Sequence, residues 1–305
     1  MKKLFCAVLL VFMLGSVSFA TEKNVAELGV LTYLGTTEQE FQSGLDDLRK
    51  ALAPLVPADE AKQEWSENDR LEEFFDSLVK TRRVIHFYDS LLSMQMALRS
   101  RKIDEIALPE PVGMYLVSNN PKYDIYFSLN MMPSTISFGF KKGNTTLQKE
   151  FNTAITAMRK DGTLARLQKD FVTELPTGEL APAKFTTFKD AKTIRVAVTG
   201  DLPPIDFIAA DGTPTGYNTA ILSEIGRRIK KNIRLVSVEA GARSAALAGE
   251  RVDVVFWYRN TEGVQAPKQA KGKNLKNVMK DSLDGVILSV PYYEWDTDLI
   301  IGLGD

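Results

Sequence analysis

Strand-like and helix-like segments alternate along most of this chain of 305 residues, and that alternation restricts its fold more than any other feature. One block runs from Glu27 to Leu108 and a second from Thr193 to Ile301, each with short apolar runs between amphipathic segments. Alternation of this kind is typical of α/β units with a largely parallel sheet. Residues 175–192, between the two blocks, hold prolines, a glycine and little periodicity, which predicts a linker.

The stretch between the first block and the linker has a different pattern. Tyr123–Phe127 and Ser137–Phe140 are predicted to be strands that bracket residues 131–133. Thr145 and Gln148 have the spacing of a capping box, which predicts that an amphipathic helix begins there. A chain of this length exceeds one typical core, so we expect two lobes or domains.

The first twenty residues have the pattern of a cleaved signal peptide. Lys2 and Lys3 supply a positive start, Leu4 to Leu14 form an apolar core, and Ser18 to Ala20 offer small residues for cleavage. The apolar run is shorter than the ~20 residues that a membrane-spanning helix needs. We therefore expect residues 1–20 to be removed and the protein to be exported.

The composition of the remaining chain narrows the function. Losing Lys2 and Lys3 reduces the 38 basic residues to 36 against 39 acidic ones, a net charge of −3, so a nucleic-acid or anionic membrane partner is not expected. Cys6, the single cysteine, leaves with the signal, which excludes disulfides and thiolate chemistry. His86 is the single histidine and no catalytic or metal-ligand cluster stands out, so we expect no enzyme, no metal and no cofactor.

The second block contains the segments IRVAVTGDLPPIDF, DGTPTGYNTAILSEIGRRI, ALAGERVDVV and VILSVPYYEWDTDLII. From Thr193 to Asp253 these segments resemble the first lobe of family 3 solute-binding proteins, the periplasmic receptors of amino-acid ABC importers. The last segment is similar to the one that crosses between the lobes of such proteins. The resemblance implies a type II periplasmic-binding-protein fold, in which two α/β lobes with mostly parallel sheets are joined by a hinge.

The first block resembles the second lobe of the same family. The segment ELGVLTYLGTTEQEF is similar to that lobe's first strand and turn, and FYDSLLSMQMALRSRKIDEIALPE to its next strand, helix and strand. FGFKKGNTTLQKEFNTAITAMRKDGTLARLQKDF resembles the family's C-terminal segment, so the lobes stand in rotated order. We expect lobe two at 25–128 with an extra segment at 54–70, a hinge return with helices at 129–174, the linker at 175–192, lobe one at 193–295 and a crossover strand at 296–305.

Two arrangements of the rotated lobes are open. In a circular permutant, both lobes form within one chain and residues 175–192 make the new covalent connection. In a swapped dimer, two chains exchange halves. A linker of about 18 residues can span up to ~60 Å when extended, so closure within one chain is geometrically easy and is the arrangement that we favour.

The resemblance implies a cation for the carboxylate of an amino-acid ligand. In the family this is an arginine after the strand that matches Val252–Tyr258, and its position falls here on Val264 or Gln265. Arg259 is close and is our candidate for a bidentate carboxylate partner, although it can equally face solvent. On lobe two, Thr36 and Thr37 match a helix start whose backbone N–H groups suit an anionic group.

Other candidate ligand-binding residues follow from the same resemblance. The carboxylate that holds the ligand ammonium maps to Glu110. The first turn of lobe one supplies Thr199 and Asp201. Trp257 and Tyr258 line the cleft as a stacking floor or fill the core, because aromatic residues in strands occur in both places.

The resemblance implies a periplasmic receptor that captures an amino acid or a similar small polar solute between its lobes for an ABC importer. The altered turn after Tyr258 motivates an alternative, a receptor-fold protein that acts as a sensor or binds a partner without delivering a solute. A few proteins of this fold are enzymes. If this protein were one of them, a carboxylate such as Glu110 would serve as its general acid.

Overall fold

A single sheet organises the residues that the computed structural model describes, which are 25–31, 46, 81–174, 182–209, 211–239, 242–260 and 285–304, without the side chains of 130–134 and 257–260. Its strand order is β2-β1-β3-β12-β4-β10-β5-β9, and β11 also pairs with β4. The strands are β1 (Val25–Leu31), β2 (Arg82–Tyr88), β3 (Glu105–Pro109), β4 (Tyr123–Lys141), β5 (Thr193–Val198), β9 (Asn232–Ser237), β10 (Val254–Asn260), β11 (Val286–Leu288) and β12 (Tyr293–Leu303).

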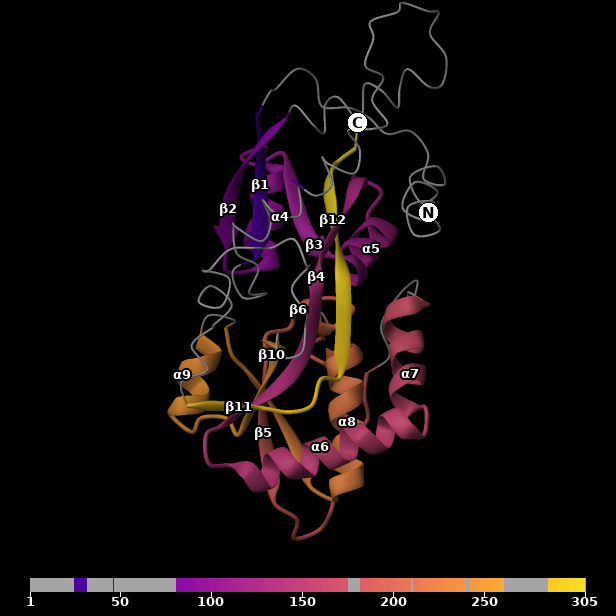
Figure 1. Ribbon diagram of the computed structural model, residues 1–305, viewed down its shortest axis with the longest axis vertical. Coiled ribbons are helices and arrows are strands. Elements are labelled where there is room, and N and C mark those ends of the chain that lie inside the picture. The colour runs from indigo at the N-terminus through magenta and orange to yellow at the C-terminus, as the bar shows by residue number, and fades with distance from the viewer. Residues whose placement is uncertain are drawn as a thin grey trace, which may run out of the picture.

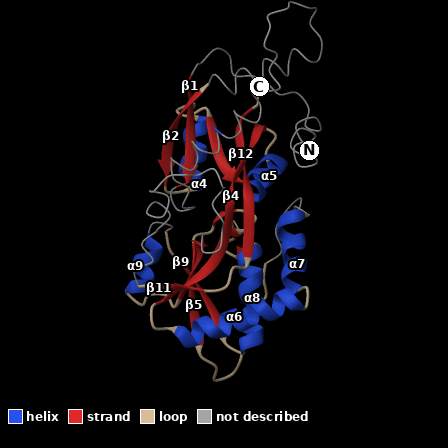
Figure 2. Ribbon diagram, in the orientation of Figure 1, coloured by secondary structure: helices blue, strands red, loops and turns tan. Residues whose placement is uncertain are grey.

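Helices flank this sheet (Figure 2), and the structure also has a small second sheet. The helical elements are α4 (Leu91–Arg99), α5 (Glu110–Asn119), α6 (Thr145–Lys160), α7 (Thr163–Gln168), the π-helical turn η3 (Lys169–Thr173), α8 (Tyr217–Ile229) and α9 (Arg243–Ala248). The second sheet consists of β6 (Asp201–Leu202), β7 (Asp206–Ile208) and β8 (Pro214–Thr215). Within the described residues, no helix is both long enough and apolar enough to span a membrane.

The two ends of the large sheet are parallel and its middle is antiparallel. β2, β1 and β3 run parallel at one end, and β10, β5 and β9 at the other. Between them β12 and β4 run antiparallel, and Figure 1 shows these two long strands running through the middle of the molecule and connecting its two parallel parts. The protein is therefore a two-lobed α/β fold with a mostly parallel sheet, as predicted, with a β1–β3 lobe and a β5–β10 lobe.

Alternating side chains give the sheet of the β1–β3 lobe two apolar faces. On one face, Met94 and Ile103 approach β1 at Gly29, where an added Cβ would lie 2.7 Å from Ile103 Cδ1. The other face forms a smaller cluster around Leu28, Phe127 and its neighbours. Glycine at this point of β1 lets α4 lie close to the sheet.

The β5–β10 lobe is covered in the same way. Phe151 of α6 makes edge contacts with Phe138 and Phe140 of β4, at ring centroid distances of 5.4 and 5.1 Å. α8 packs on the same side, and α9 covers the opposite face with Ala246 and Leu247. The main apolar cluster extends from this lobe into the β1–β3 lobe, so the two lobes share a core.

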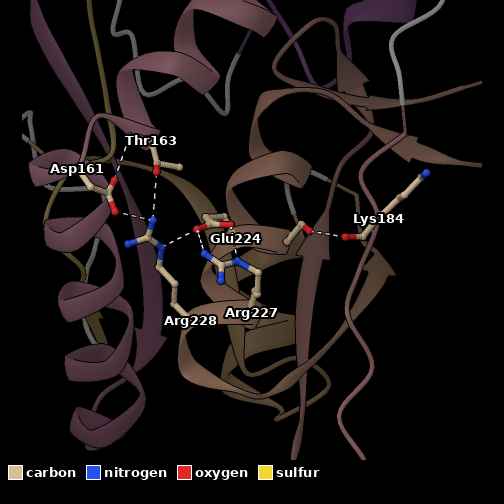
Figure 3. A network of polar contacts seen from close by, with 7 residues as sticks. Asp161, Thr163, Lys184, Glu224, Arg227 and Arg228 are labelled. Carbon is tan, nitrogen blue, oxygen red and sulfur yellow. Dashed lines mark hydrogen bonds and ion pairs between the residues drawn. The ribbon is translucent and has the colours of Figure 1, made fainter.

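A polar network attaches the turn between α6 and α7 to α8 (Figure 3). The Arg228 guanidinium lies 2.8 Å from Asp161, 2.7 Å from Glu224 and 3.1 Å from the Thr163 hydroxyl. Hydrogen bonds from Thr163, and then the Arg228 charge, lower the pKa of Asp161 to about 2. Residues 161–163 are thus held against a helix that lies about sixty positions later in the sequence.

The described part of the predicted linker follows the β5–β10 lobe. Pro182 forms a bridge with Thr215, and the Lys184 carbonyl accepts a hydrogen bond from the Ser223 hydroxyl at 2.5 Å. Asn232 donates to the carbonyls of Phe188 and Ala191. Residues 182–192 therefore make fixed contacts with α8 and β9, in addition to connecting two segments.

Three local predictions need correction. The helix at 145 has Asn144 as its N-cap, without a side-chain hydrogen bond, and the Gln148 amide donates instead to the Leu288 carbonyl at 2.5 Å, so the capping box is wrong. The two strands expected around residues 131–133 are one strand, β4, with an irregular register opposite Asp296. Helix α5 was not predicted, although proline is well tolerated in a first helical turn.

Candidate functional site

The parallel strands of both lobes end at the same place, which we call the lobe junction. β3 ends at Pro109, which pairs with Asp298 of β12, and β10 ends at Asn260, which pairs with Thr135 of β4. These two positions lie on either side of the irregular crossing opposite Asp296. In open α/β sheets, ligands bind outside the carboxyl ends of the strands. The lobe junction is therefore the candidate site.

The turn after β5 is fixed by a buried carboxylate. Asp206 is 1% exposed, and its Oδ2 accepts hydrogen bonds from the backbone N–H groups of Thr199 (2.9 Å) and Gly200 (3.1 Å) and from the Thr199 hydroxyl. Gly200 has a φ of +78°, and an added Cβ would lie 2.5 Å from the Ile208 side chain. The turn is thus held from both sides before any ligand arrives.

Burial changes the proton affinity of Asp206. Removal of its carboxyl from water raises the pKa to about 6, the nearby Asp201 charge adds to that rise, and the hydrogen bonds from Thr199 and Gly200 oppose it. Thr199 was predicted to bind the ligand, but its hydroxyl donates a hydrogen bond to Asp206. Asp206 itself was not among the predicted site residues, and its position between apolar Ile205 and Phe207 was the signal for its burial.

Asp201, the second residue predicted in this turn, reaches the other lobe. Its Oδ2 accepts a hydrogen bond of 3.3 Å from the backbone N–H of Leu91, the first residue of α4. Because α4 follows β2 directly, its N-terminus lies at the lobe junction. The Leu91 N–H is a partner of Asp201 that the sequence did not predict.

Glu110 lies on the opposite side of the lobe junction, as the first residue of α5 directly after β3. Glu110 as a whole is exposed, but its carboxyl group is partly buried. This burial, together with the negative charge of Asp296, raises the pKa of Glu110. Burial and the Glu110 charge likewise raise the pKa of Tyr293. Glu110, Tyr293 and Asp296 thus gather where β12 crosses between the lobes, and this side of the junction is acidic.

The remaining predicted residues are less well placed by the structure. Tyr258 and Arg259 end β10 and pair through their backbones with Ser137 and Ile136 of β4, beyond an irregular register. The side chains of Trp257, Tyr258 and Arg259 fall outside the described residues, as do Thr36 and Thr37 entirely. Their roles stay predictions. Arg243 of α9 donates to the Phe256 carbonyl at 2.7 Å and so supports this end of β10.

We next consider metal binding by the described residues. No group of three or more histidine, cysteine, aspartate or glutamate side chains could hold a metal ion among the described residues. The groups at the lobe junction are hydrogen-bonding and acidic side chains, together with helix N-termini. Such groups suit reversible binding of a small polar molecule.

Solved structures align with this chain at 10–12% identity. A ligand-binding component of an ABC-type import system from Staphylococcus aureus with zinc bound aligns over 92% of this chain and 66% of its own, with 10% identity and a TM-score of 0.41. The PBP AgaA from A. tumefaciens R10 in complex with agropinic acid aligns over 72% and 55%, with 12% identity and a TM-score of 0.35. The periplasmic VFT2 domain of Bordetella pertussis BvgS aligns over 92% and 81%, with 10% identity and a TM-score of 0.38.

This chain spans about two thirds of the length of the first of these structures and 55% of the second. No curated protein matches the chain. A family model does match one segment, and that segment contains β5, the turn with Asp201, α8 and β10. The resemblance predicted from Thr193 to Asp253 is thereby confirmed. Residues 194–262 carry the sequence pattern of the bacterial extracellular solute-binding proteins, family 3.

Proposed function

We propose that this protein is an exported solute-binding protein that captures a small polar molecule at the lobe junction. The observation that carries this proposal is the convergence of parallel strand ends from both lobes on one place. The segment of family 3 pattern supports it, because that family consists of extracellular solute-binding proteins. The acidic and hydrogen-bonding groups at the junction fit a ligand with polar groups at both ends.

The ligand that we propose is an amino acid or a similar amine-bearing solute. Glu110 is the proposed partner of its ammonium group, since a buried ammonium needs a carboxylate or carbonyls. Arg259 is the proposed partner of a carboxylate, with the helix start at Thr36 and Thr37 as further donors. Trp257 and Tyr258 form the proposed floor, and Thr199 and Asp201 the wall on the β5–β10 lobe.

The proposed lobe order is rotated relative to the family, within one chain. Three features support this: the family pattern begins only at residue 194, β12 pairs with β3 and β4, and residues 161–163 are bound to α8. The contacts of residues 182–192 with α8 and β9 fit a segment that belongs to the same molecule. In a swapped dimer, the pairing of β12 with β3 and β4 and the contact of residues 161–163 with α8 would form between two chains.

An ABC permease is the proposed partner for delivery of the solute. A second candidate function, sensing or partner binding without transport, is favoured by one observation. Asp201, which the resemblance places toward a ligand, already accepts a hydrogen bond from the protein's own α4. A protein whose lobes contact each other in this way can change shape in response to a signal without delivering a solute.

Thermal unfolding with added ligands tests the proposed function. Binding to the folded state alone stabilises it by about 2.7 kcal/mol at a ligand concentration one hundred times Kd, so the melting temperature must rise. We expect a rise with at least one member of a panel of amino acids, amines and small carboxylates, and no rise from any member would contradict the proposal. Light scattering on the same sample distinguishes a monomer from a swapped dimer.

A pair of variants assigns the proposed ammonium partner. Glu110→Gln removes the carboxylate at the lobe junction, and we expect it to abolish most of the shift caused by an amine-bearing ligand. Asp190→Asn is the matched control, because Asp190 is an exposed acid beside the N-terminal end of β5, away from the junction. Equal shifts in the two variants would show that Glu110 does not bind the ligand.

A further inference from the structure

One contact joins the lobes through a side chain rather than along the crossing strands. Asp201 belongs to β6 of the β5–β10 lobe, and Leu91 begins α4 of the β1–β3 lobe, 110 positions earlier in the sequence. The Asp201 carboxylate accepts the Leu91 N–H at 3.3 Å. Separation of the two lobes at this point has to break that hydrogen bond.

The donor side of this contact is a helix start that is only partly capped by its own residues. Ser90 is the N-cap of α4, and its hydroxyl oxygen accepts the Ser93 N–H at 3.2 Å. The Leu91 N–H has no carbonyl of its own helix to bind, as in any first turn. A carboxylate is a favourable acceptor here, because the first N–H groups of a helix carry partial positive charge.

The acceptor side cannot easily turn away. The backbone before Asp201 is bound to the Asp206 carboxylate through Thr199 and Gly200. The next residue, Leu202, is fully buried, and Leu91 is 3% exposed in the same apolar cluster. Since α4 and β6 are in contact, the hydrogen bond lies next to this buried cluster. A fixed carboxylate and a fixed helix start thus face each other across the lobe junction.

We propose that Asp201 is a latch that holds the two lobes together in the absence of ligand. The latch consists of Asp201, the turn that Asp206 fixes, and the N-terminus of α4. A group that makes a bond in only one of two conformations shifts the equilibrium toward that conformation. The hydrogen bond has a charged acceptor and lies beside buried side chains, which strengthens it relative to one in water. Loss of the latch therefore favours a more open arrangement.

Distance measurements between spin labels test the latch without any ligand, and so do not depend on the proposed function. Labels are attached to cysteines that replace Lys102, just after α4, and Ala245, on α9, in a Cys6→Ser background. Both positions are exposed. We expect Asp201→Ala to shift the distance distribution of the ligand-free protein to longer values. A distribution identical to that of the parent would overturn the proposal.

Asp211→Ala is the control for the loss of one acid from this lobe. Asp211 is exposed and accepts a hydrogen bond from the Thr213 N–H at 2.8 Å, within its own turn. We expect its distance distribution to match that of the parent. An equal shift in both Asp→Ala variants would also overturn the latch, because a general change of charge would then explain the opening.

A second pair of variants removes the donor instead of the acceptor. Leu91→Pro deletes the N–H, and proline is well suited to the first position of a helix. Ser90 has a φ of −147° and a ψ of 150°, an extended conformation that a following proline allows. Leu91→Ala loses the same buried side chain and keeps the N–H. We expect longer distances for Leu91→Pro than for Leu91→Ala, and equal distributions would overturn the latch.

Discussion

An arginine pairs with a carboxylate through two hydrogen bonds in each lobe, and the two pairs differ in burial. In the β1–β3 lobe, Arg83 donates to Glu105 at 2.8 and 3.1 Å, and the two side chains are 3% and 9% exposed. In the β5–β10 lobe, Arg195 donates to Asp253 at 3.0 and 2.8 Å, and the side chains are 32% and 23% exposed. The geometry is shared, but only the first pair is enclosed.

The position of both pairs sets them apart from the acids of the candidate site. Arg83 and Glu105 lie near the starts of β2 and β3, and Arg195 and Asp253 near the starts of β5 and β10. These starts point away from the lobe junction, where Asp201 and Glu110 lie at the other ends of the strands. In this fold, each ion pair at the strand starts connects two strands within one lobe. The acids at the strand ends face the candidate site.

The largest expected effect comes from breaking the enclosed pair. Arg83→Met leaves the Glu105 carboxylate buried without its partner, and loss of one member of a buried ion pair costs about 3–5 kcal/mol. Arg83 also lies 4.8 Å above the Phe127 ring, and that contact is lost with the charge. Arg195→Met should cost much less, because water compensates its more exposed partner. Urea unfolding measures both free energies.

The double variant Arg83→Met/Glu105→Leu sharpens this comparison. It removes both charges from the same place, and replacing a buried pair with apolar residues is often neutral or stabilising. We expect it to recover most of the stability lost in Arg83→Met. A double variant as unstable as the single one would show that packing, rather than an uncompensated charge, causes the loss.

A pH effect should distinguish the strand ends from the strand starts. The folded pKa of Asp206 is about 6, above its ordinary value of 3.8, so the folded protein binds this proton more tightly than the unfolded chain does. The stability that Asp206 contributes is therefore present below pH 4 and lost as the pH rises to about 6. The loss amounts to about 3 kcal/mol.

Asp206→Asn provides the measurement. The variant has no proton to lose, so the unfolding free energy of the parent relative to the variant should fall between pH 4 and pH 6 and then stay constant. Carboxylates with lowered pKa values, such as Asp161 and Asp253, are present in both proteins and cancel in this difference. A constant difference over this range would contradict the raised pKa of Asp206.

A smaller effect is expected from the glycine behind the same turn. Gly216 has a φ of +97°, and a Cβ there would lie 2.5 Å from the Pro204 carbonyl oxygen. Gly212 has a φ of +83°, with nothing within 4 Å of an added Cβ. Both Gly→Ala variants place alanine at a positive φ, which costs about 1–3 kcal/mol. We expect Gly216→Ala to cost about 2 kcal/mol more in urea unfolding, since displaced backbone adds strain.

Local patterns predicted most of the elements. The second block, predicted to start at Thr193, begins with β5, and α4 lies between β2 and β3 in the strand, helix and strand order that the resemblance implied. The capping box at Thr145 failed because the Gln148 amide finds the Leu288 carbonyl, an acceptor 140 positions away that no local pattern reveals. Helix α5 was missed because Pro111 and Gly113 resemble a break in the sequence.

The candidate site was predictable where it follows strand ends and not where it depends on burial or on the opposite lobe. Glu110 and Asp201 were predicted from the family resemblance, and they lie just after the ends of β3 and β5. Asp206 was missed because its burial arises from packing of the turn on β7 and β8. The Leu91 N–H was missed because a backbone donor has no signature in a sequence.

The central place of β12 has a consequence for biosynthesis. β12 pairs with β3 and β4 on its two sides, yet its residues 293–303 are made after both of those strands. Until they emerge from the ribosome, β3 and β4 each present an unpaired edge, and open edges invite association with other chains. Completion of the sheet therefore has to follow synthesis of this segment, and the nascent chain needs protection from self-association up to that moment.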